Sequence, residues 1–580
     1  MKHMPELNPT QRQAARANDG PVLIVAGPGT GKTKTLTERI VYILGQGTPA
    51  GHILALTFTN KAAREMRERL SKLLGATNNL PKVTTFHALG YELLSQTGAI
   101  TLIKEAERNQ LIRELPRPAA LKGVSIRELG HMISQAKTTP EQKKLTEPVR
   151  KLLAAYEQTL AEHKLHDFDD LLSKTYQLLT DHPDQQPQYT YLLVDEFQDT
   201  SELQYALLRQ LNTTDNLFVI GDPNQSIYGF RGAGAEMFGR FRHDFPHAPE
   251  ITLTTNYRSA PEIVHLGNAI FPDAPPLQPH LAQPGQVQAV QVLNEYSEAG
   301  WIINGIEREI GGSTMLRGSQ HHAAEGGAES FRDFAVLYRT HATSRTVKRL
   351  LDESGMPFQV AGEGSPYERP DVKTILDTLA YCADGADLPA VKGLSASKLK
   401  TLLEPLKTTT ATTSQLAATI VKKLQLEPSS DLQQFLNGLH RFDHQSIPAY
   451  LEHIRTIADQ DFYDPTADAI TLLTIHAAKG LEFKHLFLIG AEEDLLPHKR
   501  PHTEPNIDEE RRLFYVAVTR AQTRLDILHT KKRSSQPATL SRFITPIPQH
   551  LLPRIIDPDI ANQTRRLQKR AQKRSQTTLF

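Results

Sequence analysis

A glycine-rich loop near the start of the chain ends in a lysine and a threonine. Pro21–Thr33 reads PVLIVAGPGTGKT, an apolar run followed by three closely spaced glycines. Glycines permit positive φ, so the N–H groups of the loop can turn inward around an anion, and a helix that starts near Gly31 adds partial positive charge. Lys32 then reaches the β- and γ-phosphates of a nucleotide, and the Thr33 hydroxyl reaches Mg²⁺. Ala26 stands where this pattern usually begins with glycine, but the residues that carry the chemistry are present.

Two adjacent carboxylates follow another apolar run. Tyr191–Val194 reads YLLV and leads directly into Asp195 and Glu196. The carboxyl end of a parallel strand is the ligand-binding edge of its sheet. One carboxylate can hold Mg²⁺ and the other can position and deprotonate an attacking water. We assign Asp195 to the metal and Glu196 to the water, because a solvated acidic turn would not explain both carboxylates after a fully apolar strand.

Two glutamines stand where they could contact the same nucleotide. Gln11 opens a short helix before the glycine-rich loop, and its amide can donate to and accept from the adenine edge. Gln225 follows the apolar strand Leu217–Ile220 and is a candidate sensor of the γ-phosphate.

Aromatic and polar residues cluster after three of the expected strands. Each cluster has an alternative interpretation, because phenylalanine at a strand end is more often a core residue. The mixture of rings, amides and cations also suits stacking on bases and contacts with phosphates. The candidates for nucleic-acid contact are Phe58, Asn60, His87, Tyr228, Phe230 and Arg231.

The elements that must position these residues alternate between apolar strands and amphipathic helices, which predicts an α/β fold. The expected strands are Val22–Val25, Ile53–Thr57, Tyr191–Val194, Leu217–Ile220, Phe334–Tyr338, Thr471–Ile475 and Leu486–Ile489. Residues 100–170 are charged and helical. From Pro546 onward the chain is expected to be a linker.

The length and composition of the chain limit the kinds of protein that it can be. A chain of 580 residues is expected to divide into several domains. Cys382 is its single cysteine, which excludes an intrachain disulfide and predicts a reducing, cytoplasmic location. No membrane-spanning run or signal peptide is expected. The net charge of +1 means that a nucleic-acid surface must be a local patch.

Eight ordered motifs resemble those of UvrD/Rep/PcrA-type superfamily 1A DNA helicases. They are AGPGTGKT, LTFTNKAAREM, TFHALG, VDEFQDT, GDPNQSIYGFRGA, NYRS, LLTIHAAKGLEF and EERRLFYVAVTRA. The resemblance covers Leu7 to Arg524, apart from two helical inserts.

This resemblance implies two RecA-like P-loop domains, each a parallel sheet flanked by helices, with ATP in the cleft between them. The expected domain 1A comprises residues 1–100 and 171–255, and the helical insert 1B comprises 101–170. Domain 2A comprises 256–382 and 466–545, a reduced helical insert 2B comprises 383–465, and 546–580 is a basic tail.

The resemblance also assigns roles to individual residues. Tyr257 is expected to stack on adenine, Glu482 to bind the ribose and His476 to contact the DNA strand. Arg258 and Arg520 are expected to act as arginine fingers, with Arg520 on a helix spanning Glu509–Ala521. The expected ATP-binding set is Gln11, Gly27, Gly29, Thr30, Gly31, Lys32, Thr33, Lys34, Tyr257 and Glu482. Two further arginines of that helix, Arg511 and Arg512, are expected to form interdomain salt bridges.

The implied function is an ATP- and Mg²⁺-dependent 3′→5′ DNA helicase in repair or replication. It would translocate on single-stranded DNA and unwind 3′-tailed duplexes as a monomer or weak dimer. Where relatives carry a hairpin with an aromatic tip, the segment His529–Arg542 has no aromatic residue. That departure favours an alternative, a translocase that strips proteins from DNA with little unwinding. A non-catalytic DNA-binding module is a second alternative, which the intact GKT and the paired carboxylates oppose.

The C-terminal residues resemble a peptide that docks bacterial repair proteins on the sliding clamp. Residues 564–574 are strongly basic, and the chain ends in QTTLF. Gln576, Leu579 and Phe580 would anchor such a peptide in an apolar groove.

Overall fold

The computed structural model describes most of the chain as two compact units. The described residues are 7–75, 79–139, 145–229, 234, 236–310, 330–361, 369–384, 388–389, 391, 394–407, 411–426, 430–443, 446–448, 450–451, 464–499 and 504–558. Residues 1–295 and 480–580 form the first unit, and Tyr296–Lys479 the second. Among the described residues, no helix has the length and hydropathy needed to cross a bilayer. The domain boundaries expected from the sequence remain a prediction.

A six-stranded sheet forms the centre of the first unit. Its strand order is β3-β2-β4-β5-β1-β6, and every recorded pair is parallel. The strands are β1 (Val22–Ala26), β2 (Ile53–Thr57), β3 (Lys82–Thr85), β4 (Tyr191–Val194), β5 (Leu217–Gly221) and β6 (Glu250–Leu253). The four inner strands β2, β4, β5 and β1 are apolar almost throughout, because both faces of the sheet are covered by helices. The edge strands β3 and β6 carry polar residues such as Lys82 and Glu250.

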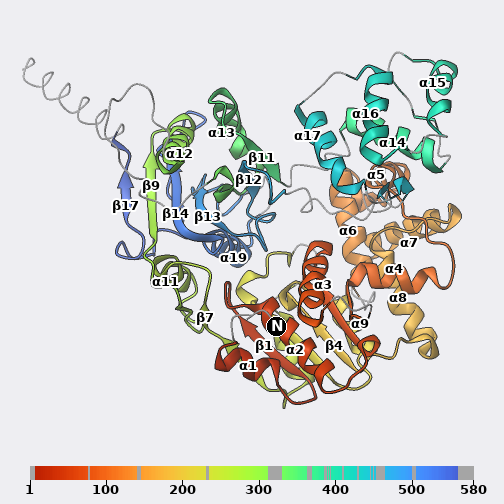
Figure 1. The fold of residues 1–580 in the computed structure, drawn as a ribbon, viewed down its shortest axis with the longest axis horizontal. Coiled ribbons are helices and arrows are strands. Elements are labelled where there is room, and N and C mark those ends of the chain that lie inside the picture. The colour runs from red at the N-terminus through yellow and green to blue at the C-terminus, as the bar shows by residue number, and fades with distance from the viewer. Residues whose placement is uncertain are drawn as a thin grey trace, which may run out of the picture. The chain divides into compact units, whose positions relative to one another are not determined.

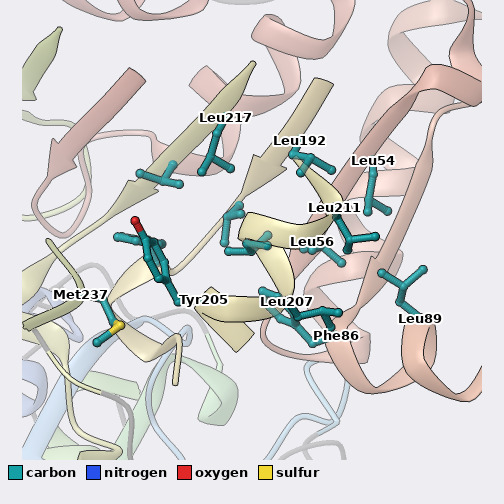
Figure 2. Packing of buried hydrophobic residues seen from close by; sticks show 14 of the residues in the cluster. Leu54, Leu56, Phe86, Leu89, Leu192, Tyr205, Leu207, Leu211, Leu217 and Met237 are labelled. Atoms are coloured by element: carbon teal, nitrogen blue, oxygen red, sulfur yellow. The ribbon is translucent and has the colours of Figure 1, made fainter. Parts of the chain in front are cut away.

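The two faces of this sheet build two separate cores. Successive side chains of a strand point to opposite faces, so Ile53 and Ala55 of β2 join one cluster while Leu54 and Leu56 join the other. Figure 2 shows the second cluster, with Leu54 and Leu56 packed near helical residues such as Leu211.

Helices flank both faces of the sheet (Figure 1). On the first face lie α1 (Pro9–Ala15), α2 (Lys32–Gly45) and α3 (Asn60–Leu74). On the second lie α4 (Phe86–Ser95), α8 (Asp170–Asp181), α9 (Glu202–Leu211) and α10 (Glu236–Asp244). Helices α5 (Glu105–Glu114), α6 (Ile126–Thr138) and α7 (Glu147–Glu162) pack on one another around a core of their own. This separate core agrees with the helical character expected for residues 100–170.

The first unit carries a second group of parallel strands. They are β9 (Gln286–Val292), β13 (Phe483–Leu488), β14 (Ala521–Thr530) and β17 (Arg554–Ile556), in the order β13-β14-β9-β17. Helices α11 (Pro261–Ile270) and α19 (Ile507–Val518) pack beside them. The expectation of a linker from Pro546 is wrong for β17, because this segment supplies backbone hydrogen bonds that continue the sheet past β9.

The second unit combines three parallel strands with helices. Strand β12 (Ile470–Thr474) lies between β10 (Phe334–Tyr338) and β11 (Phe358–Ala361). Helix α12 (Glu295–Ile310) begins at the unit boundary, and α13 (His341–Glu353) follows β10. A helical core joins α14 (Pro370–Asp384), α15 (Ala396–Leu403), α16 (Thr413–Leu424) and α17 (Ser430–Leu439). The parallel, helix-flanked sheets confirm the expected α/β class with RecA-like domains.

Candidate active site

The glycine-rich loop has the backbone shape expected of a phosphate cradle. Gly29 and Gly31 have φ of 69° and 82°, which a residue with a side chain adopts only with strain. Gly31 is also the N-cap of α2 and provides no side-chain cap, so the first N–H groups of this 14-residue helix point toward the loop. The Lys32 ammonium lies on the loop, 3.2 Å from the carbonyl oxygen of Ala26 and 3.4 Å from that of Gly27.

Gln11 is anchored directly to this loop. Its side chain is buried, and its Nε2 donates to the carbonyl oxygen of Thr30 at 2.9 Å. Its Oε1 accepts from the N–H of Asn8 at 3.0 Å, while the Asn8 side chain accepts from the N–H of Gln11. Because this capping box fixes the start of α1, Gln11 reaches the phosphate loop from a rigid element.

Thr33 and Asp195 converge from different elements. Thr33 lies in the first turn of α2 and donates to Oδ2 of Asp195, the residue after β4, at 3.4 Å. Asp195 is buried, and burial, followed by the charge of Glu196, raises its pKa to about 7, against the opposing effect of Lys32. A hydroxyl and a carboxylate brought together in this way fit Mg²⁺, which prefers oxygen ligands and would favour the ionised carboxylate.

Glu196 has an unusual backbone. Its φ of 52° and ψ of 45° are left-handed, a conformation that costs a residue with a side chain about 1–3 kcal/mol. Its carboxylate accepts a hydrogen bond from Nε2 of Gln198, two residues further on. A strained residue held by a buried partner beside Asp195 is typical of a functional site.

Arg520 reaches the loop that follows β5. Its Nη2 donates to Oε1 of Gln225 at 3.3 Å, and its Nη1 donates to the carbonyl oxygen of Leu481 at 3.2 Å. Burial, and next the positive charge of Arg258, lower the pKa of Arg520 to about 9. The expected position of Arg520 within a helix is wrong, because α19 ends at Val518 and Arg520 lies in the turn before β14.

Arg258 lies beside the phosphate loop. A Cβ placed on Gly29 would be 2.8 Å from Cβ of Arg258, so only glycine fits there. The guanidinium Nε lies 2.5 Å from Oε2 of Glu482, and Nη1 donates to the carbonyl oxygen of Thr519 at 3.4 Å. Glu482, the residue expected to bind the ribose, is therefore paired with Arg258 in this structure.

Asn256 is a site residue that the sequence analysis did not single out. Its Nδ2 donates to the carbonyl oxygen of Pro28 at 2.9 Å, and its Oδ1 accepts from the N–H groups of Arg258 and Ser259, each at 2.9 Å. Next to it, the N–H of Tyr257 donates to the carbonyl oxygen of Gly29 at 2.8 Å. In the sequence, the position of Asn256 immediately before Tyr257 and Arg258 could have indicated that it belongs to the site.

Comparison with known proteins agrees with this arrangement. The model of the UvrD/REP helicase N-terminal domain matches residues 7–246, and that of the UvrD-like helicase C-terminal domain matches 251–461 and 395–532. The chain belongs to the UvrD-like helicases. Among its relatives, the ATP-dependent DNA helicase PcrA of Bacillus subtilis is 31% identical over 94% of this chain and 86% of its own length. The PcrA of Leuconostoc citreum is 32% identical over 94% and 85%, and that of Staphylococcus aureus strain Mu50 is 29% identical over 94% and 87%.

Aromatic candidates for DNA contact in this UvrD-like helicase lie in two stacked pairs. Phe58 stacks on the buried Tyr228 with ring centroids 4.9 Å apart, and His87 stacks on Phe168 at 4.1 Å. Phe168 is 55% exposed and was not predicted as a site residue, although an aromatic ring beside Asp169 and Asp170 was visible in the sequence. A large exposed ring stacked on a partner is a platform on which a base can stack.

Other predicted contacts are placed differently or lie outside the described residues. Asn60 is exposed at the start of α3, where its Oδ1 lies 3.5 Å from the Thr85 hydroxyl. His476 follows β12 in the second unit. Phe230, Arg231 and the C-terminal QTTLF lie outside the described residues.

The two arginines of α19 that were expected to form salt bridges are placed as follows within the described part of the chain. Arg512 donates from Nε to the backbone carbonyl oxygen of Ser226 at 2.7 Å, and neither Arg511 nor Arg512 has a recorded ion pair within the described residues. The partner of Arg512 is a backbone carbonyl, which every residue carries. The sequence therefore cannot indicate it in the way that an acidic residue would.

The short hairpin after β14 lacks an aromatic tip, as the sequence indicated. Strands β15 (Lys532–Arg533) and β16 (Gln536–Pro537) are joined by two serines with φ of 48° and 66°. The buried Glu492 accepts from Nε and Nη2 of Arg533 at 2.8 and 2.9 Å, which fixes the base of the hairpin.

Proposed function

We propose that this UvrD-like helicase uses ATP and Mg²⁺ to move 3′→5′ along single-stranded DNA and to unwind 3′-tailed duplexes. The observation that carries the proposal is the hydrogen bond from Arg520 to Gln225, together with the packing of Arg258 against the phosphate loop. The first contact brings Arg520 to the loop after β5. The second brings Arg258 to the loop that holds Lys32. The names of the PcrA relatives support ATP-dependent action on DNA.

In the proposed reaction, water attacks the γ-phosphorus and ADP is the leaving group. Lys32 binds the β- and γ-phosphates. Thr33 and Asp195 would hold Mg²⁺, which would supply positive charge next to the phosphates. Glu196 orients the water and accepts its proton. Arg258 and Arg520 stabilise the charge that develops on the phosphoryl oxygens, because a rigid planar guanidinium matches that geometry.

The proposed nucleotide contacts extend from the phosphate loop. Tyr257 would stack on adenine, Gln11 would read its edge and Glu482 would bind the ribose. The loop residues that complete the set are Gly27, Gly29, Thr30, Gly31 and Lys34. Glu482 would exchange Arg258 for the ribose hydroxyls, which would leave Arg258 available to the γ-phosphate.

DNA binding is proposed to combine stacking with phosphate contacts. The proposed set comprises Phe58, Asn60, His87, Tyr228, Phe230, Arg231 and His476, and the exposed ring of Phe168 extends it. Tyr228 follows Gln225 by three residues, so a shift of this loop on hydrolysis would reach the Phe58–Tyr228 stack.

The hairpin supports a second candidate, a translocase that removes proteins from DNA with little unwinding. A two-residue hairpin with serines at its tip has no ring to stack on the first base pair of a duplex. Several further properties stay predictions under both candidates. They are a role in repair or replication, a cytoplasmic location, a monomeric or weakly dimeric state, and docking on a sliding clamp through Gln576, Leu579 and Phe580.

Strand displacement with opposite tails tests the proposal. We expect ATP-dependent displacement of a duplex with a 3′ tail and none with a 5′ tail. Preference for the 5′ tail would contradict the polarity. Stepping along single strands without displacement of either duplex would support the translocase. Repeating the assay with a sliding clamp tests the C-terminal peptide.

A further inference from the structure

Gln198 is buried between the paired carboxylates and the loop after β5. It lies in the short helix Phe197–Asp199, and its side chain is fully inaccessible to solvent. Its Nε2 donates to Oε2 of Glu196, and its Oε1 accepts from the N–H of Asp222 at 2.9 Å. Because the two ends of the amide meet an acceptor and a donor, its orientation is determined by its partners.

The loop formed by Asp222–Ser226 is fastened to Gln198 at both ends. Besides the bond from the N–H of Asp222, the Ser226 hydroxyl donates to the backbone carbonyl oxygen of Gln198 at 3.1 Å. A Cβ at Gly221 would overlap Oε1 of Gln198, so this approach requires glycine. The loop and the Gln198 amide therefore cannot move independently.

The same loop is held from α19 and the turn that follows it. Arg512 donates to the carbonyl oxygen of Ser226 at 2.7 Å, and Arg520 donates to Gln225 at 3.3 Å. A displacement of either arginine would therefore shift the loop that Gln198 contacts.

We propose that Gln198 is a positioning residue, which ties the direction of the Glu196 carboxylate to the position of the Asp222–Ser226 loop. This inference rests on the proposed role of Glu196 in orienting the attacking water. Gln198 acts only through Glu196, whose carboxylate accepts a hydrogen bond from Nε2 of the buried Gln198 side chain. Water activation then depends on the engagement of Arg512 and Arg520 with the loop.

Gln198→Glu, assayed at alkaline pH, is the test variant, because it keeps the size and the acceptor for the N–H of Asp222 but in its ionised form has no donor for Glu196. We expect kcat of DNA-stimulated ATP hydrolysis to fall about tenfold or more, the scale of a lost hydrogen bond to a charged group. KM for ATP and the dissociation constant of a fluorescent ADP analogue should stay within about twofold, because the lost contact orients the water and does not hold the nucleotide.

Gln204→Glu is the matched control. Gln204 is also buried in this segment, but its Oε1 accepts from the N–H of Ser201 at 2.9 Å, a bond that glutamate retains. The control should keep the wild-type kcat. A Gln198→Glu variant with wild-type kcat would overturn the inference.

Glu196→Gln separates this inference from the proposed function. If Glu196→Gln loses turnover while Gln198→Glu does not, Gln198 has no positioning role and the proposed function stands. If Glu196→Gln retains turnover, the proposed function itself is wrong. Should Gln198→Glu fail to fold, Ser226→Ala removes only the hydroxyl bond to the Gln198 carbonyl. A kcat reduced about threefold at unchanged KM would support the inference, and an unchanged kcat would contradict it.

Discussion

Arg520 donates a hydrogen bond from Nη2 to Oε1 of Gln225 across 295 residues of sequence, at 3.3 Å. This contact joins the turn between α19 and β14 to the loop after β5. Both side chains are buried, so the guanidinium is desolvated and held beside the proposed phosphate site. Removing either partner would leave a buried polar group without its bond.

Arg520→Lys should lower kcat of DNA-stimulated ATP hydrolysis by about a thousandfold, the lower range measured for arginine fingers. Lysine keeps the charge but loses the planar fork that bonds several oxygens at once. Steady-state phosphate release measures the effect. Arg511→Lys, an exposed neighbour on α19, should behave as wild type. If Arg520→Lys retained more than a tenth of the activity, Arg520 would not be an arginine finger.

Lys32→Ala should abolish ATP turnover while single-strand binding persists. The ammonium contacts carbonyl oxygens of the phosphate loop, and neither stacked aromatic pair includes a residue of that loop. Phosphate release and fluorescence anisotropy of a labelled oligonucleotide measure the two properties separately, with Lys72→Ala on α3 as the control. Wild-type turnover by Lys32→Ala would refute the assignment of the nucleotide site.

Arg512→Ala should reduce the stimulation of ATP hydrolysis by DNA more than the basal rate. The Ser226 carbonyl would lose a charged donor, worth about 1.5–3 kcal/mol, and the loop that leads to Tyr228 would be less restrained. We expect about a tenfold loss of stimulation, measured as the ratio of rates with and without oligonucleotide. Arg511→Ala is the matched control, and equal effects of the two variants would argue against a role for the Ser226 contact.

Asp169→Asn should stabilise the protein above pH 6. Burial, followed by the charge of Asp167, raises the pKa of Asp169 to about 6 from its ordinary value of 3.8. Between these values the folded chain holds a proton that the unfolded chain has released, so stability is lost as pH rises. Asparagine avoids this loss, which is about 1–3 kcal/mol.

Thermal melting at pH 4 to 8 checks the sign of this effect. The advantage of Asp169→Asn should be largest at pH 8 and should shrink as the pH falls through 6 toward 4. The exposed Asp184→Asn should show no such trend. A destabilised Asp169→Asn at pH 8 would mean that the carboxylate is compensated in the folded protein.

Affinity for single-stranded DNA should fall steeply with salt and depend little on sequence. If about five phosphates are contacted, affinity should fall about a hundredfold between 50 and 200 mM salt, because binding releases condensed counterions. Titration of labelled oligonucleotides of different sequence measures both properties. A strong sequence preference with a flat salt dependence would exclude a channel built on phosphate contacts and stacking.

The sequence determined the local chemistry of this helicase. The expected strands Ile53–Thr57, Tyr191–Val194 and Phe334–Tyr338 match the structure residue for residue, because fully buried parallel strands are short apolar runs with clear ends. The conformation of the phosphate loop could also be predicted from its glycines, because a backbone with positive φ favours glycine.

Tertiary structure decided which distant residues meet. No local pattern indicates that Gln198 lies between Glu196 and Asp222, or that Arg512 donates to the Ser226 carbonyl. These contacts involve backbone atoms or the side-chain amide of glutamine, a common residue. The type of residue therefore does not reveal them. The strand β17 was missed for a related reason: its stability comes from backbone hydrogen bonds to β9, a partner that only folding brings beside it.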